Sequence, residues 1–100
     1  MLRIADVTPL DGLRVRLVLS DGSRVIRDLD DLVCGPIFQP LRDDPALFRE
    51  VRVELGALVW PGGADLDPDV VIWGGAAPRD PDARPAPDLR PTAPEAASAV

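Results

Sequence analysis

Apolar and polar residues alternate along the start of the chain with the period of two that is typical of β-strands. In the clearest stretch, residues 13–19, four apolar residues share one face: Leu13, Val15, Leu17 and Leu19. Arg14 and Arg16 share the opposite face. Residues 24–29 are predicted to return as the partner strand, because Asp21 and Gly22 form a dipeptide preferred in tight hairpin turns with positive φ at both positions. Residues 4–9 alternate weakly and end at a proline, which is typical of an edge strand.

A second hairpin is predicted from residues 51–55 and 58–60, with a turn at residues 56–57. The second of these strands is expected to stop before Pro61, because proline has no N–H to donate to a sheet. Gly62 and Gly63 can then adopt positive φ and reverse the chain. Trp60 is one of two tryptophans and is expected to anchor the core. The predicted structural anchors are therefore Trp60, Pro61, Gly62 and Gly63.

Short helices are expected between and after the hairpins. One is predicted at residues 31–34, capped by Asp30 or Asp31, and another at residues 45–49, capped by Asp43 or Asp44. Residues 36–41 are predicted to form a packed loop or a single helical turn. Residues 69–73 are apolar enough to close the core, either as a short strand or as one helical turn.

The end of the chain differs from the rest in composition and in periodicity. Residues 76–100 hold six of the 12 prolines and eight alanines and show no strand or helix period. Such a segment cannot offset its ordering entropy by burial, so a disordered tail is predicted there. The expected fold class is therefore α+β: residues 1–75 form a small compact domain of antiparallel β-hairpins with one or two short helices, and residues 76–100 form the Pro/Ala-rich tail.

Composition argues against several classes of function. The net charge is −6, and the chain has no lysine and no histidine. This charge argues against nonspecific nucleic-acid binding and against docking on an anionic membrane. Without histidine the usual general base near neutral pH is missing, so no enzyme activity, catalytic residue or cofactor is expected. No signal peptide or membrane span is apparent, which favours the cytoplasm. Cys34 lies among apolar residues and is expected to be buried.

Charged residues in two regions are the candidates for binding. Asp65, Asp67 and Asp69 have the spacing that opens a calcium loop, but the sixth and twelfth positions of that loop would be Val70 and Ala76 instead of Gly and Glu. An acidic turn that satisfies its own backbone N–H groups is the preferred interpretation, so no metal site is predicted. The lesser alternative is a weak cation site, with which this loop would serve an enzyme or enzyme subunit. A basic stripe along the first hairpin is the second candidate, made of Arg14, Arg16, Arg24 and Arg27.

Several motifs occur along the chain in the same order as in the bacterial family called domain of unknown function 2442, which the chain therefore resembles. The most specific is Trp-Pro-x-Gly-x-Asp-Leu-x-Pro, which residues 60–68 match, with Gly62 where the family usually has Asn. Weaker blocks precede it: Leu17 to Gly22, Asp28-Leu29, residues 40–43 and Leu47-Phe48. The resemblance covers about residues 1–73. Residues 71–73, Val-Ile-Trp, replace the family's Leu-Tyr ending.

The resemblance implies a compact α+β fold with antiparallel strands and no established catalytic residues. It also implies an antitoxin role, since such proteins are often encoded beside a small toxin-like partner. We therefore expect a protein-binding module whose partner is a protein, and the candidate contact residues are Arg14, Arg16, Asp65, Asp67 and Asp69. The alternative is a DNA-binding or transcription-regulating accessory protein, which would need the basic stripe on one face.

Overall fold

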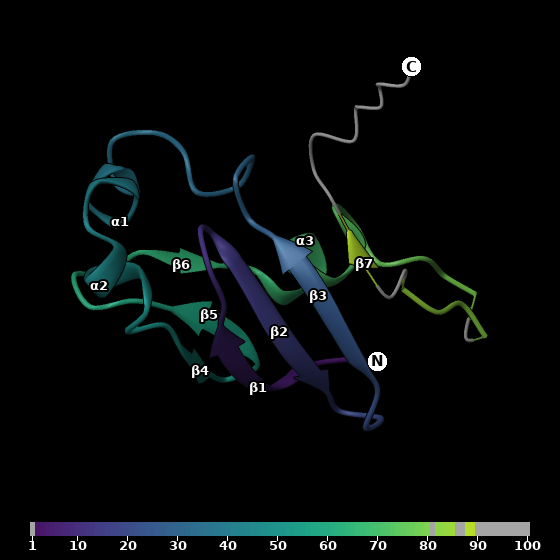
Figure 1. Ribbon diagram of the computed structural model, residues 1–100. Coiled ribbons are helices and arrows are strands. Elements are labelled where there is room, and N and C mark those ends of the chain that lie inside the picture. The colour runs from purple at the N-terminus through teal and green to yellow at the C-terminus, as the bar shows by residue number, and fades with distance from the viewer. Residues whose placement is uncertain (1, 81, 86–87, 90–100) are drawn as a thin grey trace, which may run out of the picture.

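The computed structural model in Figure 1 describes residues 2–80, 82–85 and 88–89. Two small sheets lie against one another, with short helices beside them (Figure 1). The elements of the described residues are β1 (Ile4–Pro9), β2 (Arg14–Leu19), β3 (Arg24–Asp28), α1 (Gln39–Asp43), α2 (Pro45–Phe48), β4 (Arg52–Glu54), β5 (Ala57–Val59), β6 (Asp65–Leu66), α3 (Pro68–Trp73) and β7 (Asp88–Leu89). This confirms the predicted α+β class of antiparallel hairpins with short helices.

Sheet A has the strand order β1-β2-β3-β7. β1, β2 and β3 run antiparallel, as the predicted hairpins require, and the two-residue β7 pairs parallel with β3. The turn between β2 and β3 differs from the expected one. Only Gly22 has positive φ, at 88°, and the Leu19 N–H bonds to the Ser23 carbonyl at 2.8 Å. The loop therefore holds three residues instead of two, with glycine at the left-handed position.

Sheet B has the order β4-β5-β6 and is antiparallel throughout. β5 ends at Val59, and Gly62 and Gly63 have positive φ as predicted, at 94° and 96°. The Trp60 N–H bonds to the Ala64 carbonyl at 2.9 Å, which closes the turn and leads the chain into β6. The sequence did not reveal β6, because two residues are too few to display a period.

Helices α2 and α3 each begin at an aspartate cap followed by proline, whereas α1 follows Phe38 without a side-chain cap. Asp44 accepts a hydrogen bond from the Ala46 N–H at 3.0 Å and starts α2, as expected. Asp67 does the same for α3 through the Asp69 N–H at 2.8 Å. The prediction of a helix at residues 31–34 is wrong. The N–H groups of Leu32 and Val33 both donate to the Leu29 carbonyl, which makes a single turn. Gly35, with φ of 90°, and the proline after it prevent that turn from continuing.

One hydrophobic core joins both sheets and the helices. Trp60 is 2% exposed, and its indole N–H donates to the Phe48 carbonyl at 2.9 Å. The rings of Phe38 and Phe48 lie 6.3 Å and 5.8 Å from it, between centroids. The inward residues of β2 belong to the same core: Val15, Leu17 and Leu19. Trp60 therefore occupies the anchor position that its sequence context predicts.

Two expectations from the sequence need separate comment. Cys34 is exposed, not buried, because it follows buried Val33 in a loop that turns its side chain outward, where its sulfur lies 3.4 Å from the Asp31 carbonyl. The tail predicted for residues 76–100 includes residues 81, 86–87 and 90–100, which lie outside the described residues. Within the described part of that segment, β7 is a strand that the sequence did not predict.

Candidate functional site

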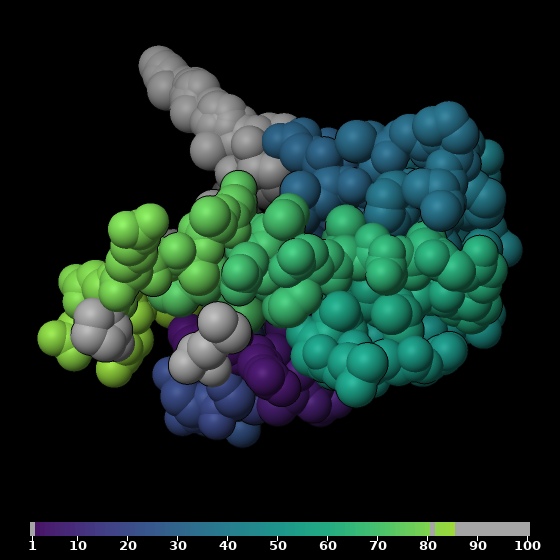
Figure 2. All heavy atoms as spheres, turned by 180° about the vertical axis from the view of Figure 1, so that it is seen from behind, coloured from purple at the N-terminus to yellow at the C-terminus, as the bar shows by residue number. Residues whose placement is uncertain are grey.

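The outer face of sheet A presents arginine side chains from β2 and β3. Along β2, Arg14, Arg16 and Val18 alternate with three buried residues, so they point away from the core. In Figure 1 the helices and sheet B lie behind or beside β2 and β3, so no helix or strand of the described residues covers the near face of these strands. Figure 2 shows the opposite side, where residues 60–80, in green, extend across the molecule.

Cross-strand pairing sets the chemistry of this face, because directly opposed residues point to the same side of a sheet. Arg16 lies opposite Ile26 on β3 and Thr8 on β1. Val18 lies opposite Arg24. The half-buried Val18 and Ile26 therefore alternate with arginine side chains. Guanidinium groups beside aliphatic side chains are typical of protein interfaces, where arginine is enriched.

Arg14 lies at one end of the outer face, at the start of β2. Its guanidinium bonds to the Asp11 carboxylate at 2.8 Å, and this hydrogen bond, with the arginine charge, lowers the pKa of Asp11 below 3.8. Both groups are well exposed to water, so the pair orients Arg14 without adding much stability. Arg14 is thus positioned by its own hairpin.

Arg27 does not belong to this face, which corrects the predicted stripe of four arginines. It lies opposite Val15 and is 1% exposed. Its guanidinium donates to the carbonyls of Val71 and Ile72 at 3.0 Å and 2.8 Å. These carbonyls are in the last turn of α3, where backbone acceptors lack helical partners and a positive charge is favourable. Arg27 therefore fixes α3 to the inner side of sheet A.

The structure separates the acidic candidates from the arginines. Asp67 caps α3, Asp69 lies in the first turn of that helix, and Asp65 is exposed on β6. Since α3 covers the inner side of sheet A, these carboxylates do not share a surface with Arg14 and Arg16. Among residues 2–80, 82–85 and 88–89, no three His, Cys, Asp or Glu side chains lie close enough together to hold a metal ion.

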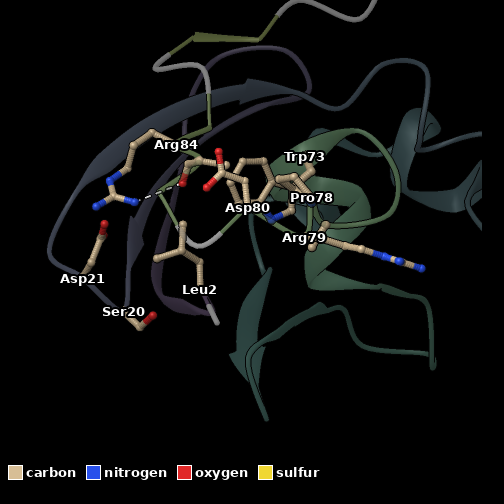
Figure 3. Close-up of a pocket in the computed structure, with 10 residues that line it drawn as sticks. Leu2, Ser20, Asp21, Trp73, Pro78, Arg79, Asp80 and Arg84 are labelled. Atoms are coloured by element: carbon tan, nitrogen blue, oxygen red, sulfur yellow. Dashed lines mark hydrogen bonds between the residues drawn. The ribbon is translucent and has the colours of Figure 1, made fainter.

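An open pocket of about 490 Å³ lies between the first hairpin turn, the end of α3 and residues 77–80 and 83–84. Figure 3 shows the Arg84 guanidinium above Asp21 at one side, and Arg79 pointing away from the opening. The pocket is lined by both apolar and charged or polar residues: Leu2, Ser20, Asp21, Trp73, Ala77, Pro78, Arg79, Asp80, Ala83 and Arg84. The described lining holds no Cys, His or Lys side chain.

The Asp21 carboxylate gives a prediction that can be checked by titration. Hydrogen bonds from the Ser23 hydroxyl at 2.6 Å and the Ser23 N–H at 2.9 Å, with a smaller effect of the Arg84 charge, lower the pKa of Asp21 below 3.8. Because the folded pKa is depressed, the stabilisation is present above the unfolded pKa and is lost as pH falls through the folded pKa. Ser23→Ala should raise the pKa of Asp21 in an NMR titration. An Asp21 that titrates at its ordinary value in the unmodified chain would contradict the turn geometry.

Sequence reasoning missed the aliphatic part of the outer face. Val18 and Ile26 read as ordinary strand residues, and only the register shows that they lie among arginines. It also missed Leu55, which was assigned to a strand and instead lies fully exposed in the turn between β4 and β5. The alternation of Val25, Arg27 and Leu29 was an available signal that Arg27 faces the core.

Comparison with known proteins yields a family and nothing narrower. Within the part of the chain that the structure describes, no helix is long and apolar enough to cross a membrane. No curated protein and no solved structure matches the chain. Residues 4–76 match the family described as protein of unknown function (DUF2442). Since this match covers more than half of the chain, including strands β1 to β6 and helices α1 to α3, the chain belongs to the DUF2442 family.

Proposed function

We propose that this chain is a non-catalytic protein-binding module, and that it serves as the antitoxin-like half of a bacterial two-protein system. The observation that carries the proposal is the outer face of sheet A, which no described helix or strand covers and where Arg16 and Arg24 alternate with Val18 and Ile26. Such a face offers fixed donors and apolar area on a rigid element, which suits recognition of a protein surface. The antitoxin role rests on the family resemblance.

Charge and contact have separate roles in this proposal. The net charge of −6 attracts a basic partner from a distance and raises the rate of association. At contact, the arginines donate to backbone carbonyls and carboxylates of the partner, while their stems cover apolar surface. High salt should therefore slow association and affect dissociation less.

A DNA-binding or regulatory role is the alternative, and the position of Arg27 counts against it. The three remaining arginines of the stripe share the outer face with Asp6 and Asp28, which lie opposite Val18 and Arg14. Mixed charge on this face weakens attraction to phosphates. Retention of the isolated chain on its own promoter DNA would favour this alternative over the protein-binding role.

The proposal is tested in cells by expressing the protein encoded beside this chain, alone and together with it. The neighbour alone should arrest growth, and co-expression of this chain should restore it through a stoichiometric complex. A neighbour that is harmless alone, or an arrest that this chain does not relieve, would remove the antitoxin role. Relief by a catalytic mechanism would require far less chain than neighbour, which immunoblotting of both proteins would reveal.

A surface variant tests whether the outer face makes the contact. Arg16→Ala should raise the Kd for the partner about five- to thirtyfold, chiefly through faster dissociation. Arg79→Ala is the matched control, since Arg79 is also exposed, lies outside sheet A, and its loss changes the net charge equally. It should change the Kd less than about twofold. Equal effects of both variants would indicate that only net charge matters and would exclude the outer face.

A further inference from the structure

The turn between β4 and β5 carries leucine in an unfavourable backbone conformation. Leu55 and Gly56 have φ of 53° and 82°, and the pairing of Glu54 with Ala57 closes a two-residue loop around them. Asn-Gly or Asp-Gly is preferred where both residues need positive φ. In this region the Cβ of leucine approaches the following carbonyl oxygen, so leucine is disfavoured relative to glycine or asparagine.

Burial of the Leu55 side chain does not compensate for this conformation. The Leu55 side chain is 101% exposed, so it buries no apolar surface in the free chain. Ile37, the other large apolar side chain that is exposed among the described residues, is 61% exposed. Leu55 is also the only non-glycine residue of the described chain with positive φ. Backbone strain and full apolar exposure therefore coincide at one residue, a combination that points to a function outside the fold.

The tip that presents Leu55 is held in place. A Cβ added to Gly56 would lie 3.5 Å from the Cβ of Arg3, so the turn rests against that side chain. On β4, Arg52 and Glu54 form an ion pair at 2.6 Å. Leu55 is thus an apolar projection on a supported hairpin, with charged groups of both signs beside it. A preorganised projection binds at a lower entropic cost than a mobile one.

We infer that Leu55 is an anchor that inserts into an apolar pocket on a protein partner. This inference rests on the proposed function and names a contact for the same complex. The partner must present a cavity about the size of a leucine side chain, with a polar rim to face Arg3, Arg52 and Glu54. A central apolar anchor with a charged rim is the usual anatomy of a protein interface. The net charge of −6 disfavours an anionic membrane as the occupant.

Leu55→Asn separates this role from a structural one. Asparagine tolerates the left-handed conformation, so the variant should raise the Tm by about 2–6 °C. It removes the apolar anchor, so the Kd for the purified product of the neighbouring gene should rise about ten- to hundredfold. Ile37→Asn is the control for loss of an exposed apolar side chain elsewhere, and it should change this Kd less than about twofold.

Calorimetric titration and thermal unfolding of the full chain give distinct outcomes. A higher Tm with weaker binding supports the inference. An unchanged Kd for Leu55→Asn, with the unmodified chain still binding, overturns the anchor and leaves the proposed function standing. A lower Tm assigns Leu55 to the fold and also overturns the anchor. Failure of the unmodified chain to bind the neighbour overturns the proposed function, and the inference with it.

Discussion

Arg27→Met is expected to lower the free energy of unfolding by about 2–4 kcal/mol, because it leaves the carbonyls of Val71 and Ile72 buried without the guanidinium donor. Each orphaned buried acceptor costs about 1–3 kcal/mol, and relief of the buried charge offsets part of the sum. Urea denaturation measures the change. For a domain this small the loss is a large fraction of the total stability.

Two control variants test whether both guanidinium nitrogens that reach α3 are needed. Arg27→Lys keeps the charge but has one nitrogen in place of the two that reach α3, so it should recover only part of the loss. Arg24→Met makes the same substitution at an exposed position of the same strand and should change stability by less than about 0.5 kcal/mol. Equal denaturation midpoints for Arg27→Met and Arg24→Met would show that Arg27 does not hold α3.

Trp60→Ala should cost about 3–5 kcal/mol, because it opens a cavity where both sheets and the rings of Phe38 and Phe48 meet. Trp60→Phe retains most of the apolar volume but removes the indole donor to the Phe48 carbonyl, which should cost about 1–3 kcal/mol. The order of the two losses separates packing from hydrogen bonding in denaturation experiments.

Trp73, the other tryptophan, allows the loss of stability at Trp60 to be compared with that at a less buried indole. It is half-buried at the end of α3 and packs on the margin of the core, so Trp73→Ala should destabilise less than Trp60→Ala. The two tryptophans also report separately on unfolding by fluorescence, since each variant leaves the other indole. A Trp73→Ala loss equal to that of Trp60→Ala would contradict the assignment of Trp60 as the main anchor.

The hairpins were predictable because burial selects one face of each strand. Val15, Leu17 and Leu19 repeat every second residue, and all three are buried. The Trp-Pro-Gly-Gly turn was predictable for a different reason: proline ends the strand, and both glycines have the positive φ that the reversal needs. In these segments the local sequence and the tertiary packing favour the same structure.

The remaining elements depend on tertiary contacts that a linear pattern does not display. β6 and β7 have two residues each, so pairing alone defines them. The end of β4 at Glu54 depends on where the two-residue turn closes, and a shift of one position places Leu55 in the turn and not in the strand. Val51, Val53 and Leu55 alternate perfectly in sequence, which favours the wrong boundary.

The candidate site was predictable only in part. Arg14 and Arg16 are two positions apart on one strand, so their common face follows from the period. Arg24 and Arg27 are an odd number of residues apart, and a regular strand must place them on opposite faces. The Asp65, Asp67 and Asp69 spacing suggested a loop, whereas Asp67 is used to cap α3. Which charged residues are left for a partner therefore depends on the fold.

The mass of the complex formed with the neighbouring protein tests the central claim most directly. The two proteins should be co-expressed, purified through a tag on the neighbour, and measured by size-exclusion chromatography with light scattering. A binding module predicts one species whose mass equals that of the neighbour plus this 10.7 kDa chain, in a fixed ratio. Elution of this chain separately from the neighbour, at 10.7 kDa or as a self-assembly, would contradict the protein-binding role.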